Sequence, residues 1–338
     1  MYIPNSKWTW LFVVIVVIQA AVILGLESYV FADFQIHLQT VKAVDSKSST
    51  KTIPTFLSLY IFGFVYELVL AYDALRLKNT IQIIGLCICN VGLLIYGAVQ
   101  IEQIQEAVDL LDGIGALDND LWDQTKPILI AIPCILGLTS VLMIGVAWKL
   151  YDEFAWTIYK HISADLRMKR RYLTYQIYIA LLKFDFFFFL GFTVQFVVVV
   201  TGRTNTEFAL TIAAIPVTII ILVFAAYFTR RESTAGMCAV IVLYIGGLAY
   251  FLFKLVRMYQ PSREAEYTSA RRSLTFFAVI TLLLIVSTIV NAIICTINFH
   301  KGLKPHIWKP RKSNDEEKST EMGPQTPGDD NPSRMMID

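Results

Sequence analysis

Charged residues are scarce in this chain of 338 residues: Asp, Glu, Lys and Arg make up 17% of it, while 56% of the residues are hydrophobic. Soluble domains carry more charge and do not leave long apolar blocks without it. The formal net charge of +2 is too small to indicate binding to DNA or RNA. Low charge therefore excludes a soluble domain, and we expect no nucleic-acid partner.

Cysteine is also rare, and no polar segment carries a pair that could form a disulfide bond. Cys87-Ile-Cys89 is not a CxxC motif, and no His cluster accompanies it, so we expect small packing residues rather than a metal site. Oxidative stapling has no visible part in this protein. All five cysteines fall inside apolar blocks: Cys87, Cys89, Cys134, Cys238 and Cys295.

Enzyme motifs are missing as well. HExxH, DHHC-type clusters, glycine-rich phosphate loops and P-loop lysines do not occur in the sequence. His161 and Asp165 are four residues apart, which is not the HxxxxD spacing of acyltransferases, and Tyr72-Asp73 lacks the GxGD partner of intramembrane aspartyl proteases. We therefore predict a protein that is not an enzyme and that uses no cofactor and no metal.

Apolar blocks of about twenty residues are what the chain does contain. A hydrocarbon core about 30 Å thick is crossed by about 20 residues of helix, because unpaired backbone groups cannot be left in lipid. The pattern predicts an all-α, polytopic transmembrane helix bundle at residues 1–299, followed by a disordered cytosolic tail at 300–338. The predicted spans are 8–29, 55–75, 80–100, 128–150, 180–201, 208–228, 235–255 and 274–297.

Two successive loops differ in charge, and this difference predicts the orientation. Residues 101–126 hold seven acidic residues and one lysine, whereas the segment between the fourth and fifth spans is rich in Lys and Arg. Positive charge is retained in the cytosol, so the basic loop and both termini are predicted to be cytosolic. A seven-span chain with an outside N-terminus is the alternative, because the last lumenal loop is basic too: Lys254, Arg257, Arg263, Arg271 and Arg272.

Three ionisable residues fall at membrane depth: Glu67, Lys183 and Asp185. Such a residue costs roughly 2.5 to 3.5 kcal/mol on insertion scales and normally has a partner. A Glu67–Lys183 pair would neutralise both charges, and Asp185 would face another helix. These residues, with Asn90 and Gln195, either line a polar path or lock the helices together. We favour the lock, in which Lys183 extends towards the interface and a neighbouring hydroxyl binds Asp185.

The segment between the fourth and fifth spans has a helical apolar stripe from Tyr151 to Leu166, followed by a basic run. The pattern indicates a helix lying on the cytosolic surface that attracts membrane lipid, including anionic lipid. A plain positive-inside anchor explains the same charges. The candidate lipid-contacting residues are Lys160, Arg167, Lys169, Arg170 and Arg171.

The stretch from Tyr151 to Phe196, YDEFAWTIYKHISADLRMKRRYLTYQIYIALLKFDFFFFLGFTVQF, resembles the signature region of a fungal family of uncharacterised multi-pass Golgi apparatus membrane proteins. The resemblance implies a Golgi membrane location, with the endoplasmic reticulum or plasma membrane as alternatives, and implies no reaction. Our hypothesis is a non-enzymatic protein that organises lipid, membrane proteins or cytosolic proteins through its basic loop. A transporter or ion pathway at Glu67, Lys183 and Asp185, or a seven-span receptor, are the alternatives.

Overall fold

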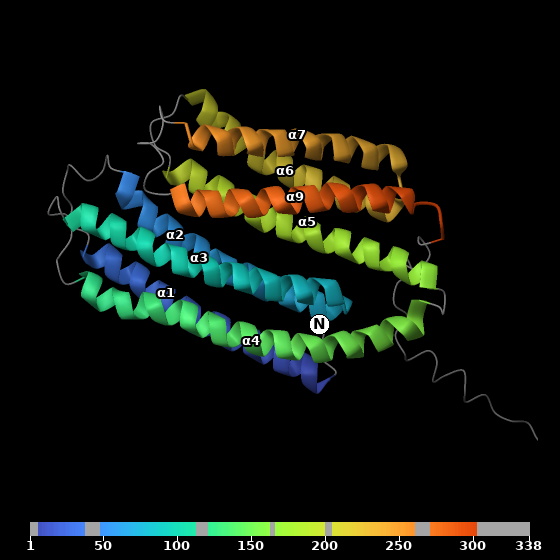
Figure 1. The fold of residues 1–338 in the computed structure, drawn as a ribbon, viewed down its shortest axis with the longest axis horizontal. Coiled ribbons are helices and arrows are strands. Elements are labelled where there is room, and N and C mark those ends of the chain that lie inside the picture. The colour runs from blue at the N-terminus through green and yellow to red at the C-terminus, as the bar shows by residue number, and fades with distance from the viewer. Residues whose placement is uncertain are drawn as a thin grey trace, which may run out of the picture.

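The computed structural model describes residues 6–37, 48–112, 121–162, 166–199, 205–260 and 271–302, and the regular structure within these ranges is α-helical (Figure 1). The predicted tail therefore lies almost entirely outside the described residues, as do residues 113–120 of the acidic loop. The helices are α1 (Lys7–His37), α2 (Ser48–Leu77), α3 (Thr80–Asp112), α4 (Leu121–Ile162), α5 (Leu166–Val199), α6 (Asn205–Arg231), α7 (Thr234–Met258) and α9 (Arg271–Ile297).

All eight helices are long and apolar enough to cross a membrane, with candidate spans from 21 residues in α6 to 35 in α4. The predicted all-α bundle of about eight candidate spans is confirmed for the described residues. An even number of crossings brings the start of α1 and the end of α9 to the same side, as Figure 1 shows. That this side is the cytosol stays a prediction.

The bundle consists of two four-helix halves. α1 to α4 pack on one another, and α5, α6, α7 and α9 form the other group, with α5 contacting α2 and α3 across the seam (Figure 1). Aromatic rings of the FDFFFF run in α5 fill this seam: Phe187 stacks on Tyr66 with ring centroids 5.5 Å apart. Gly191 lets α9 approach closely, because a Cβ there would lie 2.7 Å from the Phe277 ring.

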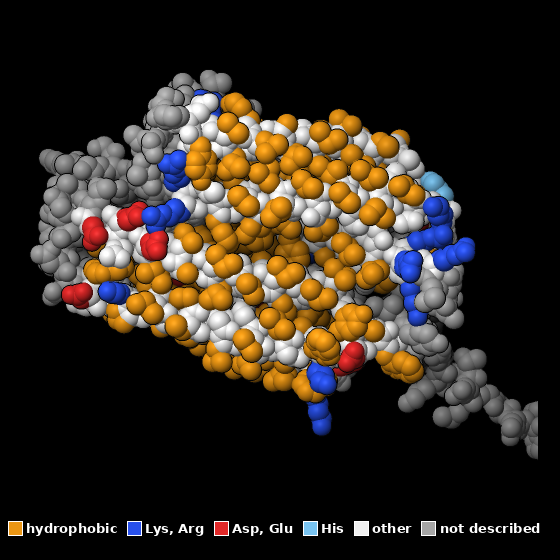
Figure 2. Space-filling model, in the orientation of Figure 1, with side chains coloured by type: hydrophobic (Ala, Val, Ile, Leu, Met, Phe, Trp, Pro, Cys, Tyr) orange, Lys and Arg blue, Asp and Glu red, His pale blue; other side chains and the backbone are white. Residues whose placement is uncertain are grey.

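The surface of the bundle has a broad hydrophobic belt. Figure 2 shows hydrophobic side chains across the middle of one face, with charged side chains gathered at its two ends. At one end Arg272 of α9 pairs with Glu102 and, at 3.2 Å, with Glu106 of α3. Arg272, which the prediction assigned to the last lumenal loop, is therefore an ion-pair partner of the acidic segment 101–126. Lys254 is buried inside α7, with its Nζ 3.9 Å from the centroid of the Phe196 ring.

The predicted surface helix is wrong, because residues 151–162 continue α4 and α5 begins only at Leu166. With 42 residues, α4 is about 63 Å long, at about 1.5 Å per residue, and extends well beyond a hydrocarbon core about 30 Å thick. Phe154 of the apolar stripe is fully buried in the same cluster as Phe12 of α1. Glu153 accepts a hydrogen bond from the Ser6 hydroxyl at 2.6 Å. Phe154 of the stripe thus packs against α1, whereas Tyr151 of the same stripe is exposed.

Candidate functional site

Glu67 lies inside the α1–α4 half, in a cluster to which each of the four helices contributes one polar side chain. The Gln19 amide nitrogen donates to Glu67 Oε2 at 3.2 Å and to Asn90 Oδ1 at 2.9 Å. The Asn90 amide nitrogen donates in turn to Gln19 Oε1 at 3.2 Å and to Ser140 Oγ at 3.1 Å. We call Gln19, Glu67, Asn90 and Ser140 the Glu67 cluster; each of them is at most 4% exposed.

The hydrogen bonds of this cluster leave the carboxyl group incompletely paired. Gln19 has two amide hydrogens, and one goes to Glu67 and the other to Asn90. Glu67 Oε1 is buried and has no hydrogen-bond partner among the residues that the structure describes. Glu67 is therefore a carboxyl group in an apolar interior that receives a single hydrogen bond from a neutral donor.

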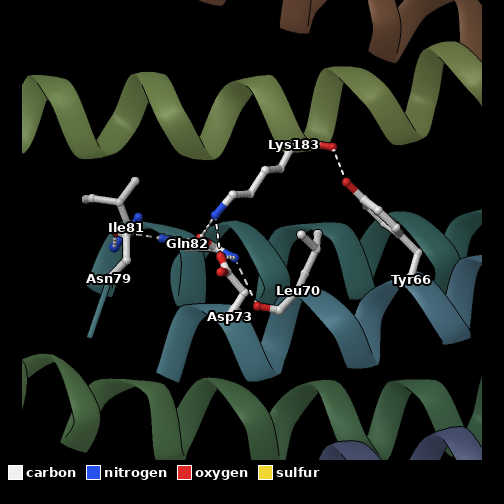
Figure 3. A network of polar contacts seen from close by, with 7 residues as sticks. All are labelled: Tyr66, Leu70, Asp73, Asn79, Ile81, Gln82 and Lys183. Atoms are coloured by element: carbon white, nitrogen blue, oxygen red, sulfur yellow. Dashed lines mark hydrogen bonds and ion pairs between the residues drawn. The ribbon is translucent and has the colours of Figure 1, made fainter. Parts of the chain in front are cut away.

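Lys183 does not reach Glu67, so the predicted Glu67–Lys183 pair is wrong. Its ammonium group binds Asp73 of α2 and, at 2.8 Å, Gln82 Oε1 of α3 (Figure 3). The Gln82 amide nitrogen donates to Asp73 Oδ2 at 3.1 Å and to the Leu70 carbonyl at 2.9 Å. We call Asp73, Gln82 and Lys183 the Asp73 cluster.

Depth in the membrane explains this choice of partner. Asp73 is six residues beyond Glu67 on α2, about 9 Å nearer the end of the helix. The Asp73 and Lys183 side chains keep 34% and 24% of their surface exposed. Lys183 thus extends towards the interface, as the lock interpretation predicted, and meets the acid that lies at its own level.

Asp185 and Gln195 form two further clusters, separate from Glu67. Asp185 accepts a hydrogen bond from the Thr288 hydroxyl of α9 at 2.6 Å, which confirms a neighbouring hydroxyl as its partner. The Gln195 amide nitrogen donates to Ser273 Oγ at 2.7 Å and to Tyr96 OH at 3.2 Å. The five predicted residues therefore belong to four clusters, and the structure brings only Glu67 and Asn90 together.

Sequence analysis missed Glu27, which is only 1% exposed on α1. The first predicted span, 8–29, contains Glu27 near its end, but Glu27 was not among the ionisable residues expected at membrane depth. In the structure α1 continues to His37, and Val30 and Phe34 are buried one and two turns beyond Glu27. The apolar periodicity of Val30 and Phe34 was the signal that could have placed Glu27 inside the bundle.

Comparison with known proteins adds a relative to this architecture. Over 322 residues, 89% of this chain and 90% of the relative, the sequence is 36% identical to a UPF0658 Golgi apparatus membrane protein of Schizosaccharomyces pombe. The chain belongs to the UPF0658 family. It is a multi-pass protein of the Golgi apparatus membrane, as the resemblance of residues 151–196 predicted. No family model and no solved structure matches the sequence.

Two apolar grooves flank α3 in this UPF0658 family member. The seam groove, of about 500 Å³, lies between α3, α5 and α9, and Figure 2 shows this face hollowed between α3 and α9. The α3–α4 groove, of about 570 Å³, ends at Trp148, Tyr151 and Asp152. Ile84, Ile88 and Val91 of α3 line both grooves. Both volumes fall in the range of about 300–1,000 Å³ that is typical of small-molecule sites.

The predicted basic patch lies where α4 ends and α5 begins. Lys160 belongs to α4, and the other four residues lie in the first turns of α5, where Arg167 and Arg170 are exposed. The Arg171 guanidinium donates to the carbonyl of Lys301, just beyond α9, at 2.6 Å. Ile177, which lines the seam groove, lies six residues beyond Arg171, about 9 Å along α5.

Proposed function

We propose that this chain is a non-enzymatic protein that organises phospholipid in the Golgi membrane. Acyl chains would occupy the seam groove, and anionic headgroups would bind the basic residues at the start of α5. The observation that carries this proposal is the position of the two features on one helix: exposed Arg170 lies about two turns before Ile177, which lines the groove. A phospholipid has the matching form, with a charged head next to an apolar tail.

The basic residues supply the headgroup end of this site. Each Lys or Arg close to an anionic membrane surface contributes about 1 kcal/mol of attraction, which salt weakens. The set comprises Arg167, Lys169, Arg170 and Arg171 of α5 and Lys160 of α4. We therefore expect anionic phospholipid to be preferred over zwitterionic phospholipid. We propose that membrane or cytosolic proteins also bind this basic surface.

A groove-filling variant tests the proposal. Ile88 lines both grooves and is 68% exposed, so Ile88→Trp should displace an acyl chain. Val242 of α7 is 67% exposed and does not line either groove, which makes Val242→Trp a matched control. Native mass spectrometry of the purified chains should find bound phospholipid on the wild type and on the control, and much less of it on Ile88→Trp.

The same measurement can contradict the proposal. Equal phospholipid occupancy of the two tryptophan variants would show that the grooves hold no particular lipid. An Arg167→Gln/Arg170→Gln double variant adds a second test, because its preference for anionic over zwitterionic lipid should fall by about fivefold per arginine at low salt. If neither the substitutions nor salt changed this lipid preference, the basic residues would have no part in lipid binding.

A further inference from the structure

Glu67 is one of three carboxyl groups spaced along α1 and α2, of which Glu67 and Glu27 are buried and Asp73 is partly exposed beside α5. Asp73 lies about 9 Å from it along α2, towards the start of α5. In the other direction Glu27 lies eight residues beyond Gln19 on α1, about 12 Å from the Glu67 cluster. The three carboxyl groups are thus distributed over much of the thickness of a hydrocarbon core about 30 Å thick.

Buried atoms without hydrogen bonds mark this column. Glu67 Oε1 and Glu27 Oε2 have no hydrogen-bond partner, and the side chains are 4% and 1% exposed. Gln100 of α3 lies beside Glu27 and is 2% exposed, and its amide nitrogen and oxygen make no hydrogen bond of good geometry with the described residues. A buried carboxyl group that is short of partners is far less costly when it is neutral than when it is ionised, so these unmade bonds favour the protonated acids.

Tyr60 lies on the same side of Glu67 as Glu27, about 10 Å from Glu67 along α2. It is seven residues from Glu67 on α2 and is 1% exposed. Its hydroxyl donates to the Leu93 carbonyl at 3.1 Å. A phenol can accept one proton while it donates another, so it can pass a proton from one acid to another.

Among the described residues, the groups that face Glu67 offer no compensating positive charge. α1 contributes Gln19, α3 contributes the thiols of Cys87 and Cys89, and α4 contributes Ser140. α5 contributes Lys183, whose ammonium group binds Asp73 instead. An ionised carboxylate buried without an opposite charge is so costly that the group takes up a proton and becomes neutral.

We propose that Glu67, Tyr60 and Glu27 form a proton relay through the α1–α4 half, with the Asp73 cluster at one outlet. Glu67 holds the transferable proton as a carboxylic acid. Each transfer breaks one O–H bond and forms another on the next oxygen, through water where the gap exceeds a hydrogen bond, so one proton crosses and no side chain is altered. Asp185 lies outside this path, because it pairs with Thr288 of α9 instead.

Proton flux in proteoliposomes tests the relay. Vesicles with a trapped pH dye and a potassium diffusion potential set by valinomycin should acidify faster with the full chain than without protein. Glu67→Gln and Glu27→Gln should each reduce the rate to that of protein-free vesicles. Asp185→Asn is the matched control, because Asp185 is 5% exposed and also has one oxygen without a partner, and it should keep the wild-type rate.

A second measurement covers variants that fold poorly. Dicyclohexylcarbodiimide reacts with protonated carboxyl groups in apolar surroundings, so it should modify Glu67 of the wild type and block the flux, as peptide mass spectrometry would show. An infrared carbonyl band of a protonated carboxyl group should disappear in Glu67→Gln. A wild-type flux equal to that of empty vesicles, an unmodified Glu67, or equal loss of flux in Asp185→Asn would each overturn the relay.

Discussion

Asp73 and Glu67 lie six residues apart on α2 and have very different surroundings. Asp73 is partly exposed and binds the ammonium group of Lys183 and the amide of Gln82. Glu67 is 4% exposed and receives one hydrogen bond from Gln19. The two acids differ by about 9 Å in depth. A lysine that extends towards the interface therefore reaches Asp73 but not Glu67. An ionised side chain is stable at the first position, and a neutral one is favoured at the second.

The close approach of α5 to α3 underlies the Asp73 cluster, and its disruption should have the largest effect. Gly85 of α3 lies against the Phe184 ring, which a Cβ would overlap. Overpacking a core typically costs about 1–3 kcal/mol, so Gly85→Leu should lower the free energy of unfolding by about 3 kcal/mol. The apparent Tm in detergent measures this loss.

Gly92 provides the control on the same helix, because a Cβ there would meet nothing within 4 Å. Gly92→Leu should change the apparent Tm little. In the Gly85→Leu background, Asp73→Asn should cost less than it does in the wild type, since Lys183 no longer reaches Asp73. An unchanged cost would mean that the α3–α5 distance does not control the ion pair.

Breaking the ion pair itself should have the next largest effect. The pair is partly exposed, so its loss should cost less than the 3–5 kcal/mol of a fully buried pair, and we expect about 1–3 kcal/mol for Asp73→Asn or Lys183→Met. The double variant should recover part of that loss, because neither partner is left alone. Glu67→Gln combined with Lys183→Met should be additive within about 0.5 kcal/mol. If Glu67→Gln and Lys183→Met were coupled while Asp73→Asn and Lys183→Met were additive, the partner of Lys183 would be Glu67 rather than Asp73.

Asp185 is a third case, in which a hydroxyl rather than an ammonium group meets the acid. Thr288→Val removes that hydroxyl while keeping the shape, so it should cost about 1–2 kcal/mol by leaving a buried carboxyl oxygen without its donor. Thr288→Ser keeps the hydroxyl and should unfold close to the wild-type temperature. Equal apparent Tm values for the valine and serine variants would show that this hydrogen bond contributes nothing.

Glu67→Gln should have the smallest effect on stability. A neutral acid and an amide have nearly the same size, and Gln19 can still donate to an amide oxygen, so the apparent Tm should correspond to a change within about 0.5 kcal/mol. Calorimetry of Glu67→Gln and of Asp73→Asn under the same conditions compares the two losses of stability directly. A loss as large as that of Asp73→Asn would indicate that Glu67 is ionised and that the contrast between the two acids is wrong.

Sequence reasoning predicted some residues of the polar clusters and failed on their partners. Glu67, Asn90, Lys183, Asp185 and Gln195 are all polar residues within spans, which a hydropathy pattern reveals. The hydroxyl partner of Asp185 was also expected. The partner of Lys183 was not, because several acids lie within reach of a flexible lysine, and the choice depends on how α2 and α5 are offset along their axes.

The sequence by itself determined the number of crossings, because each apolar block must form its own helix to satisfy its backbone in lipid. It also determined the Golgi family, through residues 151–196. Only the tertiary structure decided that α4 continues to Ile162 and that Glu27 joins the interior. It also decided that Lys183 binds Asp73. These outcomes depend on contacts between helices far apart in sequence, whose offsets and spacing are set by packing, and hydropathy along one helix contains no information about them.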